Sequence, residues 1–385
     1  MTRASDTAKL LGAGGSILGS LDIGGGQIGG RRNIIINGAM KVAQRGTSST
    51  GLGATSGYYT LDRNRLTFSG TAGRLTMTQT ADGPSGFANC LKLDCTTADT
   101  SVAAGEILIL GQNFEGQDLQ QFKKGTSDAE KITVSFYVKG NANATYTCEL
   151  YDNDNSRSIA QEFSVTTSWS RVVLTFNNET SNALDDDNAS SLSLHLWLHG
   201  GSTFAGGTFA SNTWHTTNAN RLSDSQSSFF DSTDRTFFIT GVQMEVGSVA
   251  TPFEHRSFGE EFDLCLRYYE KSSAYGVAED STAGANIYGV VGMAGSASSV
   301  GNNDATMIHW QKSKRVAPTL VFYDAAGNSG KLSYAEAGVG RADNIAIRSS
   351  NIGVNRSRIG TAGASGLDAG EAVEMLFQYT ADSEL

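Results

Sequence analysis

Two histidines and a tryptophan alternate along the segment 191–199 (SLSLHLWLH). Successive side chains of a β-strand point to opposite faces, so the four leucines face a core while His195, Trp197 and His199 share the other face. A tryptophan on an open sheet face can stack on the apolar face of a pyranose, with the imidazoles donating hydrogen bonds to its hydroxyls. Two other interpretations of the row are a metal site and a face covered by residues 200–234 or by a neighbouring subunit. A metal is disfavoured, because alternate strand positions lie about 6.6 Å apart and no third ligand accompanies them.

Three further aromatic residues are candidates for ligand contact: Trp214, Trp310 and Tyr323. Trp214 belongs to the segment 200–234, which shows no clear periodicity. Connections of that length are uncommon in compact domains and are usually functional, disordered or packed against another subunit. We favour a ligand or a subunit contact here. The candidate ligand-binding residues are therefore His195, Trp197, His199, Trp214, Trp310 and Tyr323.

Motifs of catalysis and metal binding are weak in this chain. It contains no G-x-S-x-G elbow, no H-E-x-x-H motif and no glycine-rich loop that opens a βαβ unit, so we predict no catalytic residue, no enzymatic activity and no cofactor. The acidic runs 152–156 (DNDNS) and 185–188 (DDDN) offer oxygen ligands, but the first lacks the glycine and the bidentate glutamate of an EF-hand loop. Such runs also arise in ordinary turns. No metal ligand is assigned, and calcium at either run stays an alternative.

Composition limits the class of partner. The 385 residues carry 29 basic and 39 acidic side chains, a net charge of −10, which argues against a nucleic-acid partner. No stretch approaches the roughly 20 apolar residues of a spanning helix, so we expect no membrane insertion. There are 45 glycines and only 3 prolines, which excludes collagen-like chains and indicates turns between many short strands. The four cysteines form no C-x-x-C pair and are predicted to be reduced and buried.

Alternation of polar and apolar residues dominates the chain from residue 33 onwards. The clearest run, 131–139 (KITVSFYVK), places Ile132, Val134, Phe136 and Val138 on one face. Such runs, separated by Gly, Asn, Asp and Ser clusters, predict a jelly-roll β-sandwich over residues 32–256. The predicted strands are 33–37, 74–80, 91–95, 106–110, 131–139, 145–151, 161–165, 170–176, 191–199 and 235–246.

The pattern changes at Ser257, which forms a capping box with Glu260 and predicts a short linker helix over 257–271. Its apolar stripe, which includes Cys265 and Leu266, packs either on the sandwich or against copies of itself. Alternation then returns and predicts a second, small β domain over 272–385. Its predicted strands are 286–294, 305–312, 319–324, 331–334, 344–349 and 371–380.

Residues 1–31 contain nine glycines and only scattered leucines and isoleucines, so they cannot form a core of their own. They form either an extended anchoring segment, ordered against a larger partner, or an unstructured tail. The predicted fold is therefore all-β: an N-terminal anchoring segment, a jelly-roll β-sandwich, a short helix and a second small β domain.

Several strings of the sequence resemble known virion proteins. NIIINGAM (33–40), AQRG (43–46) and YTLDR (59–63) resemble the start of tail-fibre-like virion proteins of bacteriophages. ITGVQMEVG (239–247), ATPFEHR (250–256) and CLRYY (265–269) resemble the junction between sandwich and helix in the same group. SWSRVVLTF (168–176) and the closing strand 238–244 resemble carbohydrate-binding jelly rolls, although Thr240 and Gly241 stand where those modules often carry an aspartate pair.

The resemblance implies a tail fibre or receptor-binding protein of the virion, assembled in the host cytoplasm, that attaches the particle to a host surface polysaccharide or lipopolysaccharide. It also implies a homotrimer whose residues 1–31 dock on a tail or baseplate protein. Two alternatives stay open: a structural adaptor or capsid fibre without receptor binding, and a glycan-degrading enzyme of the tailspike type.

Overall fold

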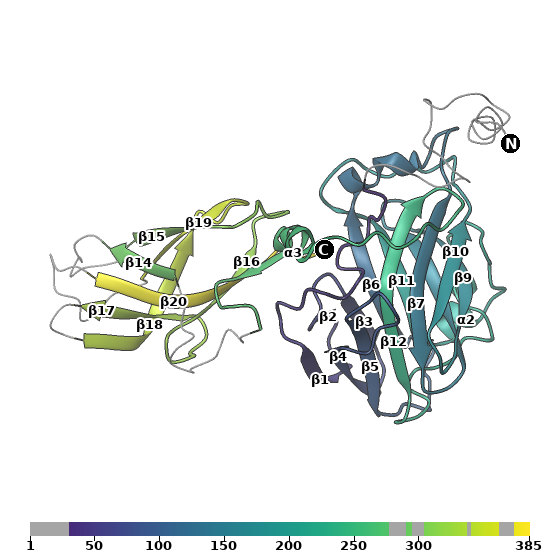
Figure 1. Ribbon diagram of the computed structural model, residues 1–385, viewed down its shortest axis with the longest axis horizontal. Helices are drawn as coiled ribbons and strands as arrows, with labels where there is room; N and C mark the ends of the chain where they lie inside the picture. Colours follow the sequence, from purple (N-terminus) through teal and green to yellow (C-terminus); the bar gives the residue numbers. More distant parts are fainter. Residues whose placement is uncertain (1–30, 277–289, 295–303, 337–339, 362–372) are drawn as a thin grey trace, which may run out of the picture.

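The structure is a computed structural model that describes residues 31–276, 290–294, 304–336, 340–361 and 373–385. A larger and a smaller β unit lie on either side of a single linker helix, and nearly all regular structure is β (Figure 1). This confirms the predicted all-β class. Residues 1–30 of the predicted anchoring segment lie outside the described residues. No helix in the described part of the chain is long and apolar enough to cross a membrane.

The larger unit is a sandwich of two six-stranded sheets whose neighbouring strands pair antiparallel, which confirms the predicted jelly-roll β-sandwich. Sheet A has the order β1 (Ser48–Leu52), β4 (Arg74–Thr80), β5 (Cys90–Thr97), β12 (Thr236–Val246), β7 (Ile132–Gly140) and β10 (Ser170–Phe176). Sheet B has the order β2 (Gly57–Tyr58), β3 (Arg65–Ser69), β6 (Ile107–Glu115), β11 (Ser190–Gly200), β8 (Ala144–Asp152) and β9 (Arg157–Val165).

The inward faces of both sheets form one hydrophobic core. Val134, Phe136 and Val138 of β7 are fully buried in it, as their alternation predicts. Leu192, Leu194 and the other inward residues of β11 face them from sheet B. The four cysteines are buried and unpaired, which confirms the prediction of reduced thiols.

The predicted strand 33–37 does not form. Residues 33–46, here called the N-terminal plug, instead close one edge between the sheets. Asn33 Nδ2 donates to Val242 O at 3.1 Å, and Gln112 Nε2 donates to Ile36 O at 2.8 Å. Ile35 and Met40 enter the core. Alternation predicts only that one side of a segment is buried, and the plug satisfies this condition without belonging to a sheet.

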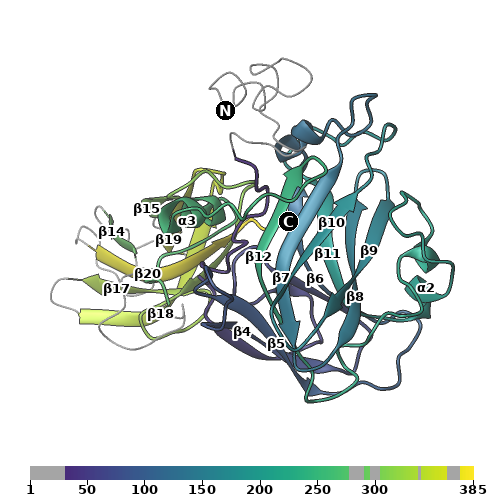
Figure 2. The ribbon, with the colours of Figure 1, turned by 45° about the vertical axis from the view of Figure 1, so that its right-hand side comes forward.

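Residues 201–234, here called the covering loop, lie against the outer face of sheet B. The loop contains α2 (Ser202–Ala205) and the 3-10 turn η4 (Asn218–Asn220). It pairs with the free edge of β9 through bridges from His215 to Ser158 and from Ser211 to Ala160. Leu222 is buried against the outward side chains of β6 and β11. Figure 2 shows α2 beyond β8 and β9 at the rim of the sandwich.

The linker helix α3 (Phe258–Leu266) starts with the predicted capping box between Ser257 and Glu260. It ends earlier than predicted, because β13 (Tyr269–Lys271) pairs with a strand of the smaller unit. Cys265 and Leu266 are buried within the same chain, whereas Phe258 is exposed.

The smaller unit is organised around β20 (Val373–Asp382), which pairs with four strands. The described strands of this unit are β13, β14 (Val290–Ala294), β15 (Asp304–His309), β16 (Thr319–Tyr323), β17 (Lys331–Glu336), β18 (Gly340–Ser350), β19 (Arg356–Thr361) and β20. Trp310, Phe322 and Phe377 lie in its separate core. The sequence did not predict β19, because Ile359 is the only large apolar residue in its alternating face.

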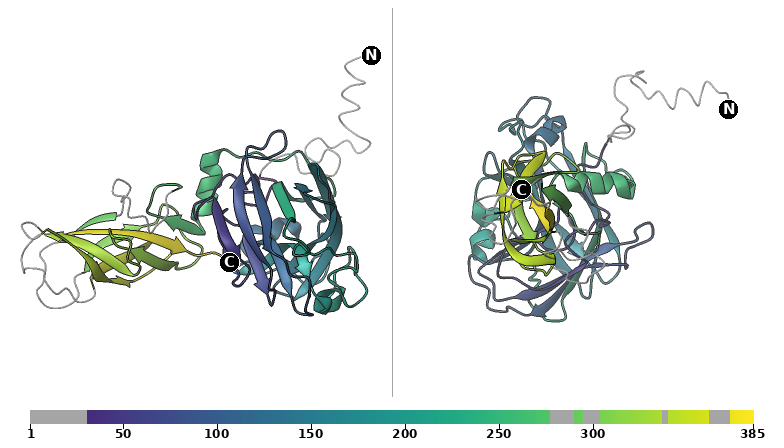
Figure 3. Two further views of the ribbon diagram at one scale, coloured as in Figure 1. Left: turned by 90° about the horizontal axis from the view of Figure 1, so that it is seen from below. Right: turned by 90° about the vertical axis from the view of Figure 1, so that its left-hand side faces the viewer.

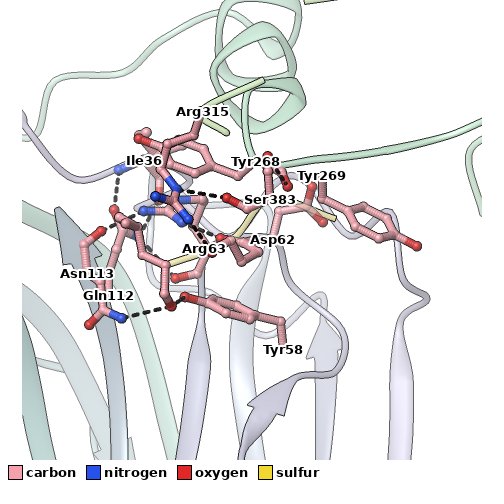
Figure 4. Close-up of polar contacts among 12 residues, drawn as sticks. Ile36, Tyr58, Asp62, Arg63, Gln112, Asn113, Tyr268, Tyr269, Arg315 and Ser383 are labelled. Atoms are coloured by element: carbon pink, nitrogen blue, oxygen red, sulfur yellow. Dashed lines mark hydrogen bonds and ion pairs between the residues drawn. The ribbon is translucent and has the colours of Figure 1, made fainter. Parts of the chain in front are cut away.

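The last residues of the chain lie between the two units (Figure 3). Tyr58 Oη and Asn113 Nδ2 of the sandwich both donate to Leu385 O, at 2.9 and 3.0 Å. Arg63 is 1% exposed, pairs with Glu384 and lies 3.5 Å from the centroid of the Tyr268 ring. Figure 4 shows Arg63 between the sandwich residue Asn113 and Tyr268. We call this set of contacts the C-terminal junction.

Candidate functional site

The structure places His195, Trp197 and His199 on the outer face of β11, and the covering loop lies over them. Trp197 is 1% exposed: the Arg221 guanidinium lies 4.8 Å and the Phe204 ring 5.0 Å from its ring. Trp197 therefore offers no open ring face, and the expectation of an exposed stacking platform is wrong at this position. The structure shows the alternative in which residues 200–234 cover this face.

A buried carboxylate, Glu149 of β8, fastens the covering loop to this face. Arg221 donates to Glu149 from Nε and Nη2, both at 2.6 Å, and Trp197 Nε1 donates to it at 2.9 Å. The fourth contact is His195 Nδ1 at 3.1 Å. Burial alone would raise the pKa of Glu149, but the hydrogen bonds from His195 and Arg221 and the guanidinium charge outweigh it and lower the pKa to about 2.

His199 has a second fastening role. It is fully buried between Ser228 Oγ, 2.8 Å from Nδ1, and Glu106 Oε2, 3.1 Å from Nε2. Both ring nitrogens are engaged, so His199 offers neither of them to a ligand. Among the described residues, no three histidine, cysteine or carboxylate side chains are grouped as a metal site requires.

The other predicted site residues lie in separate regions. Trp214 is half-buried, with Nε1 donating to Asn177 O at 2.9 Å and the Lys124 ammonium 4.7 Å from its ring. Trp310 is buried in the smaller unit, where Nε1 donates to Gly353 O at 2.9 Å. Tyr323 is half-buried at the end of β16. The six predicted residues are therefore not brought together into one site.

Asp152, the first residue of the acidic run 152–156, is ion-paired within the chain. Lys124 Nζ lies 2.5 Å from Asp152 Oδ2 and 2.7 Å from Asn182 O, and both charged side chains are buried. The ammonium thus lies among oxygen atoms that would be calcium ligands in the alternative interpretation of this run.

A different row of side chains crosses the outer face of sheet A, where strands β5, β12, β7 and β10 lie side by side (Figure 2). Phe238 of β12 is opposite Lys139 of β7 on one side and Lys92 of β5 on the other. Ser170 pairs with Val138, which places the preceding Trp169 beside Lys139. Aromatic and cationic side chains therefore alternate in the order Trp169, Lys139, Phe238, Lys92, here called the aromatic row.

Contacts within the aromatic row fix its members. Lys139 Nζ lies 5.3 Å from the Trp169 ring and 4.7 Å from the Phe238 ring, both within cation–π range. The two rings meet edge to face at 6.3 Å. Both are half-buried, and Trp169 Nε1 has no hydrogen-bond partner in the described part of the chain. The row is thus a preorganised aromatic surface with part of each ring open to solvent.

Each lysine of the row is also ion-paired. Lys139 lies 2.7 Å from Asp82, and Lys92 lies 2.7 Å from Asp94. The row therefore presents ammonium donors and carboxylate acceptors next to its rings without an excess of positive charge.

A second group of rings adjoins the row through Tyr137, two residues before Lys139 on β7. Phe87 lies 5.3 Å from Tyr137, 5.0 Å from Phe253 and 5.1 Å from His255. These four rings are the aromatic cluster. Together the row and the cluster extend the aromatic surface across sheet A.

Trp169 and Phe238 lie in the strings that resemble carbohydrate-binding jelly rolls, and the alternation of β7 places Tyr137 opposite the core. These residues were nevertheless not among the predicted site residues. To predict them, one must know which outer face of the sandwich the covering loop leaves open. That depends on long-range contacts such as Arg221 with Glu149, which no local pattern signals.

No family model matches the chain, and no curated protein matches it. Solved structures with similarity include a family 11 carbohydrate-binding module from Clostridium thermocellum in complex with a mixed-linked tetrasaccharide (9% identity, TM-score 0.28, 54% of this chain and 99% of that one). Another is the N-terminal cellulose-binding domain of Cellulomonas fimi β-1,4-glucanase C (12%, 0.26, 48% and 90%). A third is the enzymatically active domain of bacteriophage CBA120 tailspike protein 4 (11%, 0.30, 56% and 21%). Similarity at this level carries no argument about function, so the proposed function is argued from the surface of this chain alone.

Proposed function

We propose that this protein is a non-enzymatic attachment protein of a bacteriophage particle, a tail fibre or receptor-binding protein, that binds a host surface glycan through the aromatic row. The observation that carries this proposal is the row itself, with its two half-exposed rings next to paired ammonium and carboxylate groups. The strings that resemble tail-fibre-like virion proteins supply the biological setting.

Trp169 and Phe238 match what a sugar ring requires. The C–H face of a pyranose packs on an aromatic ring, while its hydroxyls need donors and acceptors at the edge of that ring. Lys139 and Lys92 supply donors, and Asp82 and Asp94 supply acceptors. Because cation–π and ion-pair contacts already hold these side chains, little conformational entropy is lost on binding.

The charges of the row favour an uncharged glycan. Each lysine has a carboxylate partner, and the whole chain carries a net charge of −10, so an acidic polysaccharide would be repelled. We therefore expect the affinity for the glycan to change little between low and high salt, which would screen a charge-driven interaction.

Single sugar contacts of this kind are weak, and the proposed homotrimer would present several copies on each fibre. Simultaneous engagement raises the apparent affinity without any new contact. Light scattering of the full-length protein tests this part of the proposal, and a monomer would count against it.

The binding test compares Trp169→Ala and Phe238→Ala with the unmodified protein on an array of bacterial O-polysaccharides and capsular polysaccharides. Each variant loses about tenfold or more in affinity, since a lost stacking contact of about 1.4 kcal/mol corresponds to a factor of ten. The control is Phe258→Ala, which removes a ring that is 49% exposed on α3. Unchanged binding by both row variants, or no binding to any polysaccharide by the unmodified protein, would contradict the proposal.

Two further measurements separate the alternatives. Purified protein that binds a surface glycan blocks adsorption of the particle to whole cells, whereas a structural adaptor does not. New reducing ends after incubation with the bound polysaccharide would show a glycan-degrading enzyme instead of a non-enzymatic attachment protein.

A further inference from the structure

Two hollows lie side by side at one end of the sandwich. The first has a volume of about 420 Å³ and is lined by Asn143, Thr145, Ser164 and Thr166 among others. The second has a volume of about 330 Å³ and is lined by residues that include Val102, Ser202 and Ala205. Ser227 lines both hollows, so they flank one stretch of the covering loop. We call the pair the end groove.

The end groove lies away from the C-terminal junction. Gly200, which lines the second hollow, pairs with Ile107 at the beginning of β6. Arg267, next to the junction residue Tyr268, donates to Glu115 at the opposite end of the same strand. The end groove is therefore at the far end of the sandwich from the smaller unit.

The lining of the end groove combines free hydroxyls with small apolar groups. Thr145, Ser164 and Ser202 line the groove and have no side-chain hydrogen bond within the described residues. Val102, Val165 and Ala205 form the apolar parts of the walls next to these hydroxyls. Asp224 is the one carboxylate among the described lining residues. A volume in the range of small-molecule sites, with walls that combine hydroxyls, small apolar groups and one carboxylate acceptor, fits sugar units.

The wall between the two hollows is held in place. Ser227 N donates to Thr145 O at 2.8 Å, and Gln226 Nε2 donates to Trp197 O at 2.8 Å. Ser228 contacts the buried His199 at 2.8 Å. The hollows therefore keep their shape before a ligand arrives, which lowers the entropic cost of binding.

The hairpin between β9 and β10 connects the end groove to the aromatic row. Thr166 lines the first hollow, and Trp169 follows three residues later. Three extended residues span at most about 11 Å, so a ligand of a few sugar units can touch both.

We propose that the end groove binds further units of the same polysaccharide chain that stacks on the aromatic row, so that the protein recognises an extended, uncharged chain instead of a single terminal sugar. This inference rests on the proposed function. It predicts that affinity rises with the length of the polysaccharide until the chain occupies both surfaces.

The test fills each hollow from its exposed rim with Ser164→Trp and Ser202→Trp in the full-length protein. The control is Thr180→Trp, which adds the same bulk at an exposed position outside the groove. The probe is the O-polysaccharide or capsular polysaccharide that binds on the array, cut into fragments of one repeat unit and of several.

Both filled variants should lose at least about fivefold in affinity for the long fragment and stay within about twofold for the short one, while the control matches the unmodified protein. Equal binding of the long fragment by the filled variants and the control would overturn this inference alone, provided Trp169→Ala still lowers the affinity about tenfold or more. If Trp169→Ala has no effect either, or if no polysaccharide binds at all, the proposed function fails together with it.

Discussion

Asn37 is fully buried in the N-terminal plug, and its side chain holds two separate chain segments. Nδ2 donates to Val42 O at 2.8 Å and to Asp62 O at 3.0 Å, and Oδ1 accepts from the backbone of Lys41 and Val42 at 2.9 Å each. Its φ of 62° lies in the left-handed region, which asparagine tolerates better than most residues. These contacts explain how the plug turns inside the sandwich.

Asn37→Ala should lower the free energy of unfolding by about 2–4 kcal/mol, because buried carbonyl and N–H groups lose their partners and alanine disfavours a positive φ. Urea denaturation measures this change. Asn351→Ala is the matched control, since Asn351 also has a positive φ, of 52°, but is exposed. Equal losses for both variants would mean that backbone conformation alone, and not the hydrogen bonds, makes Asn37 important.

Glu149 makes the free energy of unfolding of the sandwich depend on pH in the acidic range. Its pKa in the folded chain is about 2, below the ordinary value of 4.5, so the carboxylate stabilises the fold above pH 4.5. This stabilisation is lost as the pH falls from about 4.5 towards 2, because the unfolded chain takes up the proton first. The free energy of unfolding measured across this range should therefore fall with pH.

Glu149→Gln should show a shallower fall in the free energy of unfolding between pH 5 and pH 2, together with a lower stability at neutral pH. The control is Glu130→Gln, because Glu130 is half-exposed and its ion pair with Lys123 lies at the surface. A slope that stays identical to that of the unmodified protein would show that Glu149 does not carry this acid sensitivity.

At the level of single elements, the irregular part of β12 shapes the open face of sheet A. The pairing of β12 with β7 shifts between Thr240 and Gln243, and Gly241 has a φ of 64° there. A Cβ on Gly241 would lie 2.7 Å from Phe87 Cζ and 2.9 Å from Tyr137 Cδ2. The glycine thus lets the rings of the aromatic cluster lie directly on the strand.

Gly241→Ala should displace Phe87 and Tyr137, lower the free energy of unfolding by about 1–3 kcal/mol and change the near-UV circular dichroism of the aromatic rings. Gly259→Ala is its control, because Gly259 is in α3 with no atom within 4 Å of the added Cβ. That variant should be as stable as the unmodified protein or slightly more so. An unchanged near-UV spectrum in Gly241→Ala would contradict the close approach of the rings.

For the molecule as a whole, the C-terminal junction couples the two units. Glu384 is the carboxylate partner of both Arg63 and Arg45, and Arg315 Nη2 donates to Glu384 O at 2.9 Å. A single residue near the end of the chain therefore touches the sandwich and the smaller unit at once. Because Arg63 is buried, loss of its partner leaves an uncompensated charge.

Glu384→Ala should weaken this coupling. We expect two separated transitions in calorimetry, and a larger radius of gyration in X-ray scattering as the units move apart. Lys312→Ala is the control, since its ion pair with Asp263 at 2.8 Å is exposed on both sides and exposed pairs contribute little. A single, unshifted transition in Glu384→Ala would show that other contacts hold the units together.

Local sequence patterns determined the all-β class, most strands of the sandwich, the start of α3 and the reduced cysteines, because alternation and capping depend on neighbouring residues. Only the tertiary structure decided that residues 33–46 form a plug and that Tyr269–Lys271 belong to a sheet, since both depend on partners far along the chain. The same holds for the candidate site. His195, Trp197 and His199 alternate on one face as predicted, but Arg221 and Glu149 fasten a distant loop over them, and the open aromatic surface is therefore the one formed by Trp169 and Phe238 on the other sheet.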